Sequence, residues 1–191
     1  MQVAPGVPEI AATNRWCTAF IARAASAFKA HGPQFALAGS YALWVFGAPE
    51  PVHDVDFVVA ETDAEAAETA LRKAGFQIVH VPEDWLFKAY PDDDVLVDVL
   101  YQLNGESVDA AVLGSAEVHD VLAIRMPVLL PTLVVSEKLR SLNEHHCDFA
   151  ALLPAARAVR ERVDWDALRV ATADNDFAAA FLMLVDRLGI T

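Results

Sequence analysis

Cysteine and long hydrophobic runs are both scarce in this chain of 191 residues. Only Cys17 and Cys147 occur, far apart and without metal-ligand spacing, so a reducing cytoplasm is the expected compartment. The longest uninterrupted apolar stretch has 9 residues, Phe177 to Val185, whereas a membrane-spanning helix needs about 20. The N-terminus lacks a basic segment followed by an apolar one. We therefore expect neither a secretion signal nor a membrane partner.

Basic residues are also few: 14 Lys and Arg stand against 27 Asp and Glu, giving a formal net charge of -13. This balance favours solubility and opposes non-specific binding to nucleic acid. The net charge counts against tRNA as a partner, but a clustered basic face from Arg125, Lys138, Arg140 and Arg157 could override it. By contrast, hydrophobic residues make up 55% of the chain. That share is enough to bury a core, and it excludes global disorder.

The order of patterns along the chain predicts an α+β protein. Helical spacing or helix signals mark residues 8–31, 41–46 and 62–75, the last with a capping box formed by Thr62 and Glu65. Short apolar or β-branched segments predict strands at 34–38, 52–60, 76–81, 85–90 and 95–101, a turn at 91–94, and a hairpin of 117–122 with 125–130. From Pro131 onward the pattern is helical, at about 131–142, 146–160, 164–173 and 175–188. We thus predict a mixed core over 1–130 and a helical region over 131–191.

Three acidic residues stand in apolar surroundings. Asp54 and Asp56 are two apart in a predicted strand and would project to the same side, while Val55 and Phe57 face a core. Two like charges this close repel unless a cation lies between them. Asp98 is a lone acid inside another apolar strand, where an unpaired carboxylate is costly. A shared divalent ion would resolve both problems, and oxygen ligands favour Mg²⁺ or Mn²⁺ over zinc.

A phosphate site is predicted upstream of these acids. Gly39 and Ser40 lie between a predicted strand and the start of a helix. Backbone N–H groups there can hold phosphate, glycine allows close approach, and the serine adds a hydroxyl donor. A phosphate cradle facing three carboxylates is the equipment of two-metal phosphoryl or nucleotidyl transfer.

The ordered set Gly39-Ser40, Asp54-Val55-Asp56 and Asp98 resembles the signature of the DNA polymerase β-type nucleotidyltransferase superfamily. The resemblance covers roughly residues 33 to 101. The helical region, with Lys138 and Asp148 on successive helices, is similar to small bacterial members of the abortive-infection and toxin–antitoxin kind. The fold that this implies is a mixed β-sheet nucleotidyltransferase core with flanking helices and a C-terminal helical bundle.

The resemblance also implies an activity and roles for the residues. Asp54 and Asp56 would hold two Mg²⁺ ions, with Mn²⁺ as a substitute, and Asp98 would bind the catalytic ion. Gly39, Ser40 and a helical lysine, Lys138, would bind the nucleotide. An acceptor hydroxyl on tRNA, protein or a small molecule such as an antibiotic would attack the α-phosphate of an NTP, and pyrophosphate would leave.

Two positions depart from the pattern of the superfamily. Glu50 stands where relatives often carry an arginine, and Val52 where they carry a threonine. This departure motivates a second hypothesis: a nucleotidyltransferase-like module that binds nucleotide or a cognate protein partner, as in a toxin–antitoxin pair. A phosphohydrolase using the same metals is a third hypothesis, but a clear His-Asp metal pair is missing from the sequence.

Each motif also has a purely structural interpretation. Asp54 and Asp56 would then mark a solvated strand end, Gly39 would end a strand, and Ser40 would cap a helix. Lys138 would be a solvated helix side chain, and Asp148 a cap. Adjacent residues His145 and His146 rarely share one ion on a helix, so polar residues at a helix N-terminus are favoured there. Trp85 could stack on a base or pack a strand face, and Lys88 is the basic candidate for an acceptor or phosphate contact.

Overall fold

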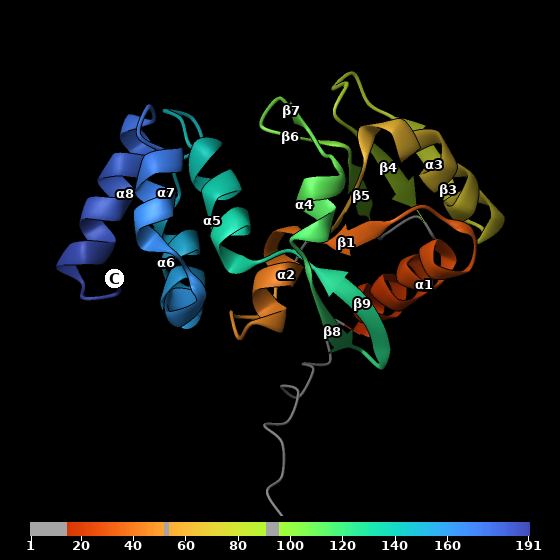
Figure 1. Ribbon diagram of the computed structural model, residues 1–191, viewed down its shortest axis with the longest axis horizontal. Coiled ribbons are helices and arrows are strands. Elements are labelled where there is room, and N and C mark those ends of the chain that lie inside the picture. The colour runs from red at the N-terminus through yellow and green to blue at the C-terminus, as the bar shows by residue number, and fades with distance from the viewer. Residues whose placement is uncertain (1–14, 52–53, 91–95) are drawn as a thin grey trace, which may run out of the picture.

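The computed structural model describes the chain from residue 15 onward, apart from residues 52–53 and 91–95 (Figure 1). The start of the predicted first helix, two residues of the predicted strand 52–60 and the predicted turn 91–94 therefore lie outside the described residues. The helices are α1 (Arg15–His31), α2 (Gly39–Val45), α3 (Ala64–Lys73), α4 (Ala110–Gly114), α5 (Pro131–Arg140), α6 (Phe149–Val159), α7 (Trp165–Ala171) and α8 (Asp176–Arg187), with 3₁₀ turns η2 (Glu61–Asp63) and η3 (Arg160–Arg162). The strands are β1 (Phe35–Leu37), β2 (Val55–Val59), β3 (Gln77–His80), β4 (Leu86–Tyr90), β5 (Val97–Leu100), β6 (Gln102–Leu103), β7 (Glu106–Ser107), β8 (Glu117–Val121) and β9 (Ile124–Val128).

Seven strands form one mixed sheet in the order β3-β4-β5-β2-β1-β9-β8. Strand β2 pairs parallel with β5, and β1 pairs parallel with β9, while the other neighbours are antiparallel. The order of the strands in the sheet differs from their order in the sequence, so segments far apart in the chain lie side by side. The mixed sheet with its flanking and C-terminal helices confirms the predicted α+β class.

The alternation of side chains along β2 separates a core face from a polar face. Phe57 packs against Phe28 of α1 and Phe35 of β1, with ring centroids 5.6 and 5.8 Å away. Helices α1 and α3 cover this face (Figure 1). Asp56, one residue earlier, points to the opposite face, where α2 and α5 pack together. The strand pattern thus holds an acid between the sheet and the C-terminal helices.

The C-terminal helices begin at well-defined caps. Asp148, Asp164 and Asn175 accept backbone N–H bonds at the N-termini of α6, α7 and α8. The amide of Asn175 also donates to the carbonyls of Arg140 and Leu142, which ties α8 to the end of α5. These helices form a group beside the sheet (Figure 1). The division of the chain at residue 130 into two domains stays a prediction.

Two local details differ from the predicted elements. Helix α3 begins at Ala64 after a 3₁₀ turn, and its N-cap, Asp63, makes no side-chain cap bond. The predicted capping box is therefore wrong, because the chain tightens into a 3₁₀ turn before α3 begins. The small hairpin of β6 and β7 and the five-residue helix α4 were not predicted, because two- and five-residue elements are too short to show a period. Within the described part of the chain, no helix is both long and apolar enough to cross a membrane.

Candidate active site

Two of the predicted acids are direct neighbours in the sheet. The parallel pairing of β2 with β5 sets Asp56 beside Asp98, and the antiparallel pairing of β4 with β5 sets Lys88 beside Asp98. Residues in register on adjacent strands point to the same face. Lys88, Asp98 and Asp56 therefore form a row across three strands, on the face turned toward the C-terminal helices.

Gly39 brings the phosphate-site turn against this row. The backbone N–H of Ala38 donates to the carbonyl of Asp56 at 2.8 Å, and Gly39 follows with a φ of 58°. A Cβ atom on Gly39 would lie 1.8 Å from Oδ2 of Asp56. Glycine is thus required here twice, by its backbone conformation and by the carboxylate packed against its Cα.

Asp54, Asp56 and Ser40 meet at one cavity of about 470 Å³, here called the phosphate cavity. Its wall consists of the first turns of α2, residues 48–51, the two acids before and within β2, Lys138 of α5, and one face of α6. Ser40 lies in the first turn of α2, and Ala38 rather than Ser40 holds the N-cap position. The hydroxyl therefore does not serve as the helix cap.

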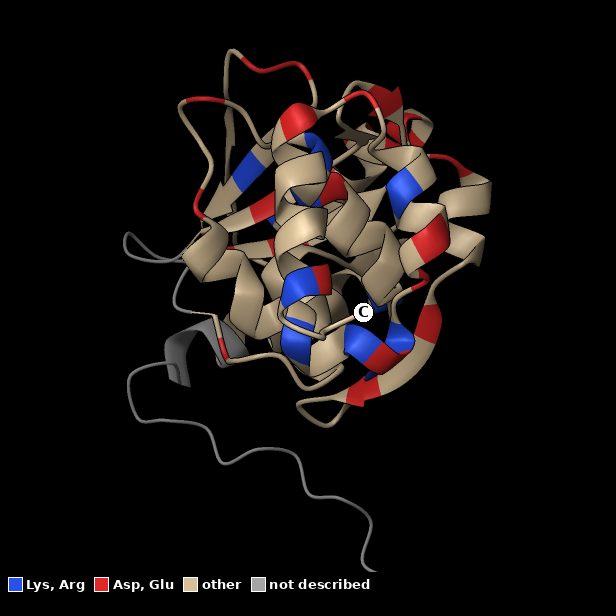
Figure 2. Ribbon diagram, turned by 90° about the vertical axis from the view of Figure 1, so that its left-hand side faces the viewer, with Lys and Arg blue, Asp and Glu red and all other residues tan. Residues whose placement is uncertain are grey.

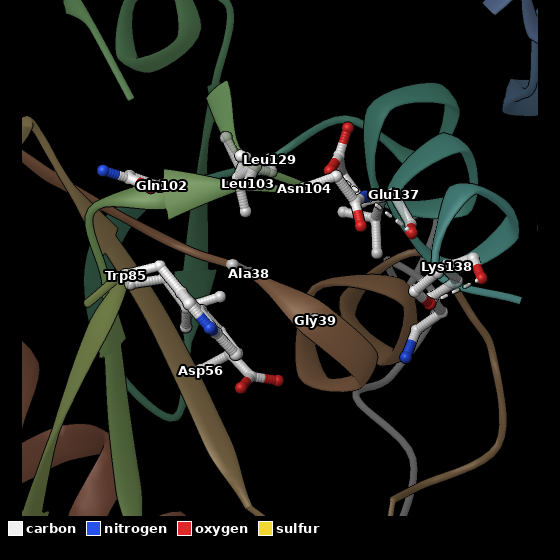
Figure 3. Close-up of a pocket in the computed structure, with 14 residues that line it drawn as sticks. Ala38, Gly39, Asp56, Trp85, Gln102, Leu103, Asn104, Leu129, Glu137 and Lys138 are labelled. Carbon is white, nitrogen blue, oxygen red and sulfur yellow. Dashed lines mark hydrogen bonds between the residues drawn. The ribbon is translucent and has the colours of Figure 1, made fainter. Parts of the chain in front are cut away.

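A second cavity of about 420 Å³, here called the Trp85 cavity, opens on the other side of Asp56. Asp56 and Trp85 line it from the sheet side, and Asn104, Glu137 and Lys138 line it from the hairpin turn and α5 (Figure 3). Trp85 is 39% exposed, so its ring is available to a ligand rather than packed in the core. Asp56 and Lys138 line both cavities and therefore stand where the two meet.

Burial and charge make the pKa of Asp56 unusual. Burial raises it from 3.8 to about 7; the positive charge of Lys138 opposes this rise, and the negative charges of Asp98 and Asp54 add to it. The pKa of Lys138 is in turn lowered by its own burial, against the attraction of Asp56. Lys138 is thus a half-buried residue of the cavity walls rather than a solvated helix side chain.

The Lys88–Asp98 pair is the other charged contact of the row. Lys88 Nζ lies 3.1 Å from Oδ1 and 3.4 Å from Oδ2 of Asp98. Burial raises the pKa of Asp98 despite this hydrogen bond and charge from Lys88, and Asp54 adds to the rise. Burial lowers the pKa of Lys88, but its hydrogen bond to Asp98 and the negative charges of Asp98, Tyr90 and Asp54 outweigh that effect and leave it raised.

The donor set suits a hard divalent cation. Asp54, Asp56 and Asp98 offer only carboxylate oxygens; the negative charge of Asp54 acts on both Asp56 and Asp98, and that of Asp98 acts on Asp56, which a cation would relieve. Among the described residues, however, no three His, Cys, Asp or Glu side chains are gathered closely enough to hold a metal ion as they stand. Asp54 is exposed at the start of β2, and Asp98 faces Lys88. The site therefore offers the type of oxygen donor that Mg²⁺ prefers, with Asp56 and Asp98 side by side on adjacent strands.

Sequence reasoning missed several residues of the cavities. Asn104 donates to the backbone carbonyl of Glu137 at 3.0 Å and to its carboxylate at 2.6 Å, which joins the β6–β7 turn to α5 (Figure 3). Gln102 and Glu137 complete this side of the Trp85 cavity. The only signal in the sequence was Asn104-Gly105, a turn dipeptide, which predicts a turn but not what it contacts.

Glu50 lies in the wall of the phosphate cavity, where the superfamily pattern has an arginine. Its Oε1 atom is buried and has no hydrogen-bond partner among the described residues. Val52 and His53 lie outside those residues. The acid at position 50 therefore adds negative charge to a cavity that already contains Asp54 and Asp56.

The alternative motifs lie away from the two cavities. His145 and His146 are exposed in the turn between α5 and α6 rather than on a helix. Asp148 caps α6, as its structural interpretation expected. On the face of the C-terminal helices, Lys and Arg segments are interspersed with Asp and Glu segments (Figure 2). Arg140 of α5 is paired with Glu106 of β7 and with Glu137 of its own helix.

Of the comparisons with known proteins, only the one with solved structures finds similar proteins, and these share one fold. No family model and no curated protein matches the sequence. Among solved structures, a crystal structure of ANT(2″)-Ia in complex with adenylyl-2″-tobramycin aligns with a TM-score of 0.60 at 11% identity, over 86% of this chain and 98% of that one. A solution structure of the antibiotic-resistance factor ANT(2″)-Ia gives 0.59 at 13% identity, over 92% and 98%. An antigenic nucleotidyltransferase-like protein from Paracoccidioides brasiliensis gives 0.52 at 15% identity, over 87% and 91%.

These likenesses extend over most of both chains in each case, so they include the C-terminal helices as well as the sheet. At sequence identities of 11 to 15%, the structural similarity establishes a shared fold but not a shared substrate. The chain therefore has the nucleotidyltransferase fold.

Proposed function

We propose that this protein is a Mg²⁺-dependent nucleotidyltransferase that moves NMP from an NTP to a hydroxyl of a small-molecule acceptor, with release of pyrophosphate. The observation that carries the proposal is the pairing of Asp56 with Asp98 on adjacent strands, with the Gly39 turn packed against Asp56. A phosphate-binding turn next to paired carboxylates is the arrangement that this reaction needs.

In the proposed reaction, residues around the two cavities have separate roles. Gly39 and Ser40, at the start of α2, hold the triphosphate; Ser40 lines the phosphate cavity and Gly39 lines the adjoining Trp85 cavity. Lys138 lies where the cavities meet and neutralises phosphate charge beside the reacting bond. Asp98 stands next to Asp56 on the adjacent strand, and its role in the proposed reaction is to accept a proton from the acceptor hydroxyl.

Asp54, Asp56 and Asp98 are the residues that would hold the metal ions, since they offer oxygen donors on one face. Bound there, Mg²⁺ supplies positive charge for the attacking and leaving oxygens. The Gly39 turn keeps the Asp56 carboxylate in place, because the close contact leaves it no room to move toward α2.

A small cationic acceptor fits the charge of the site better than tRNA. Of the four basic residues proposed for a tRNA-binding face, Lys138 lines the cavities and Arg140 is paired with Glu106 and Glu137. Glu50 and Glu137 add negative charge to the cavity walls. ANT(2″)-Ia binds adenylyl-2″-tobramycin, a nucleotidylated small molecule, and we extend the same class of acceptor, a hydroxylated amine, to this chain.

The test is transfer of label from α-labelled NTPs with Mg²⁺ to a panel of hydroxylated amines that includes tobramycin, with tRNA and the protein itself as parallel acceptors. We expect labelled small molecule and equimolar pyrophosphate from wild type, and loss of both from Asp56→Asn. Transfer only to tRNA or to protein would overturn the acceptor class. Absence of transfer to every acceptor, together with absence of metal binding, would overturn the proposed reaction.

A second candidate, a non-catalytic module that binds nucleotide or a cognate protein partner, is favoured by Glu50 in the phosphate cavity. An unpaired acid there weakens triphosphate binding. Under this alternative, Asp56→Asn leaves the biological effect of the protein intact, whereas under the proposed function that conservative change abolishes it. A growth assay in cells expressing either form separates the two.

A further inference from the structure

The ammonium group of Lys88 contacts the carboxylate of Asp98, which the proposed reaction assigns to a metal ion. Its nitrogen atom lies within 3.4 Å of both oxygens of Asp98. A third residue, Asp56, stands next in the row, and Lys138 is the basic residue that acts most strongly on it. Asp56 and Asp98 thus each have a lysine as counter-charge without any metal.

The contact between Lys88 and Asp98 is fixed by the pairing of β4 with β5 in the sheet. Lys88 and Asp98 are cross-strand partners in the middle of β4 and β5, with Phe87 and Val99 of the neighbouring pair buried in the core. The side chain of Asp98 is 13% exposed and that of Lys88 is 26% exposed. An ionised acid this enclosed is costly to leave unpaired, so the ammonium of Lys88 stabilises the carboxylate form of Asp98 when the metal is absent.

We propose that Lys88 is a displaceable counter-ion, which holds Asp98 in the metal-free protein and must leave that carboxylate before a divalent ion can bind there. This inference rests on the proposed function, since it concerns the same carboxylate. Two cations on one carboxylate repel each other, and the ammonium already engages both oxygens. The partly exposed, flexible lysine stem allows the ammonium to swing out toward solvent.

The consequence is that Lys88 helps to set the affinity of the site for the divalent ion, and so the metal concentration at which the ion is bound. The ion pair between Lys88 and Asp98 stabilises the metal-free protein. The same ion pair weakens metal binding, because the ion must displace the ammonium group. Removing it therefore has opposite effects on the two states: the metal-free fold loses stability, and the affinity for the divalent ion rises. A merely structural ion pair would lower stability without tightening metal binding.

The experiment measures Mn²⁺ binding by calorimetry, without nucleotide, for wild type, Lys88→Met and Lys88→Gln. Both variants remove the charge, and the glutamine amide can still donate to Asp98, so it serves if the methionine variant does not fold. We expect each to bind Mn²⁺ tighter than wild type, by about tenfold or more. Thermal unfolding should show a lower midpoint than wild type in EDTA and a larger rise on adding Mn²⁺.

Three controls make the result specific. Lys88→Arg keeps the charge and should keep the wild-type affinity. Lys73→Met removes an exposed lysine of α3 and should change nothing. In the double variant Lys88→Gln with Asp98→Asn, the gain in affinity should disappear.

The outcomes separate the two claims. Wild type that binds Mn²⁺, with unchanged or weaker binding in both Lys88 variants, overturns the counter-ion role and leaves the proposed function standing. Absence of Mn²⁺ binding in every form overturns both.

Discussion

Gly39 is the residue on which the geometry of the site depends. Its φ of 58° is a left-handed conformation that glycine adopts freely, and its Cα touches the carboxylate of Asp56. Gly189 provides a matched comparison, because its φ is 61° and nothing lies within 4 Å of the position where its Cβ would be. The two glycines separate the cost of the backbone conformation from the cost of the contact.

We expect Gly39→Ala to destabilise the protein more than Gly189→Ala. Both variants carry the left-handed penalty of about 1–2 kcal/mol. Only the first also forces a methyl group into the carboxylate of Asp56, which adds about 1–3 kcal/mol. Urea unfolding of both variants measures the difference. Equal losses of stability would show that the carboxylate moves aside freely.

The raised pKa of Asp56 predicts a pH dependence of stability in the absence of metal. The folded protein keeps the proton of Asp56 up to a pH of about 7, whereas an unfolded aspartate loses it near pH 4. Between these values the folded state binds more protons, so rising pH lowers the free energy of unfolding, by at most about 1.4 kcal/mol per pH unit for one group.

Asp56→Asn removes this titration. In EDTA, we expect wild type to lose stability relative to Asp56→Asn as the pH rises from 5 to 8, and most of the change to lie below the folded pKa. Urea unfolding of both proteins at each pH gives the difference directly, because contributions from other groups largely cancel. Parallel curves for the two proteins would contradict the raised pKa.

At the scale of elements, sequence periodicity predicted the longer helices and strands. The strand register determines which of their residues lie close together, and periodicity does not predict it. The strand 95–101 and the helix 131–142 were predicted from local pattern, and β5 and α5 lie within those ranges. The side-by-side placement of Asp56 and Asp98 comes from a parallel pairing between segments some 40 residues apart, which no local pattern encodes. Lys88 opposite Asp98 depends on a second register, and the Asn104 contact on a third.

The C-terminal helices matter to the site because α6 forms one wall of the phosphate cavity. Ala151 and Ala158 are both exposed residues of α6, but only Ala151 lines that cavity. We expect Ala151→Trp to raise the Kd for Mg²⁺–NTP by about tenfold or more, because the indole fills space that the triphosphate needs. Ala158→Trp is the matched control and should bind like wild type. Equilibrium binding of a fluorescent NTP analogue measures both, and equal affinities would place the nucleotide elsewhere.

At the scale of the whole molecule, the net charge of -13 acts on every partner that approaches. Along the ribbon of the C-terminal helices, segments of Lys and Arg are interspersed with segments of Asp and Glu (Figure 2), so the basic residues there are not segregated from the acidic ones. A negative field accelerates the encounter with cationic acceptors and slows that with tRNA, and salt screens both effects.

We therefore expect kcat/KM for a cationic hydroxylated acceptor such as tobramycin to fall several-fold as NaCl rises from about 20 to about 200 mM, where the screening length drops below about 10 Å. A neutral polyol of similar size, if accepted, should show a much weaker dependence, since steering acts only on its partner's charge. Initial rates of transfer at fixed saturating Mg²⁺–NTP measure both. Equal salt dependence for the two acceptors, or a shift of tRNA in a binding gel at about 150 mM salt, would mean that local positive charge, and not the overall field, selects the acceptor.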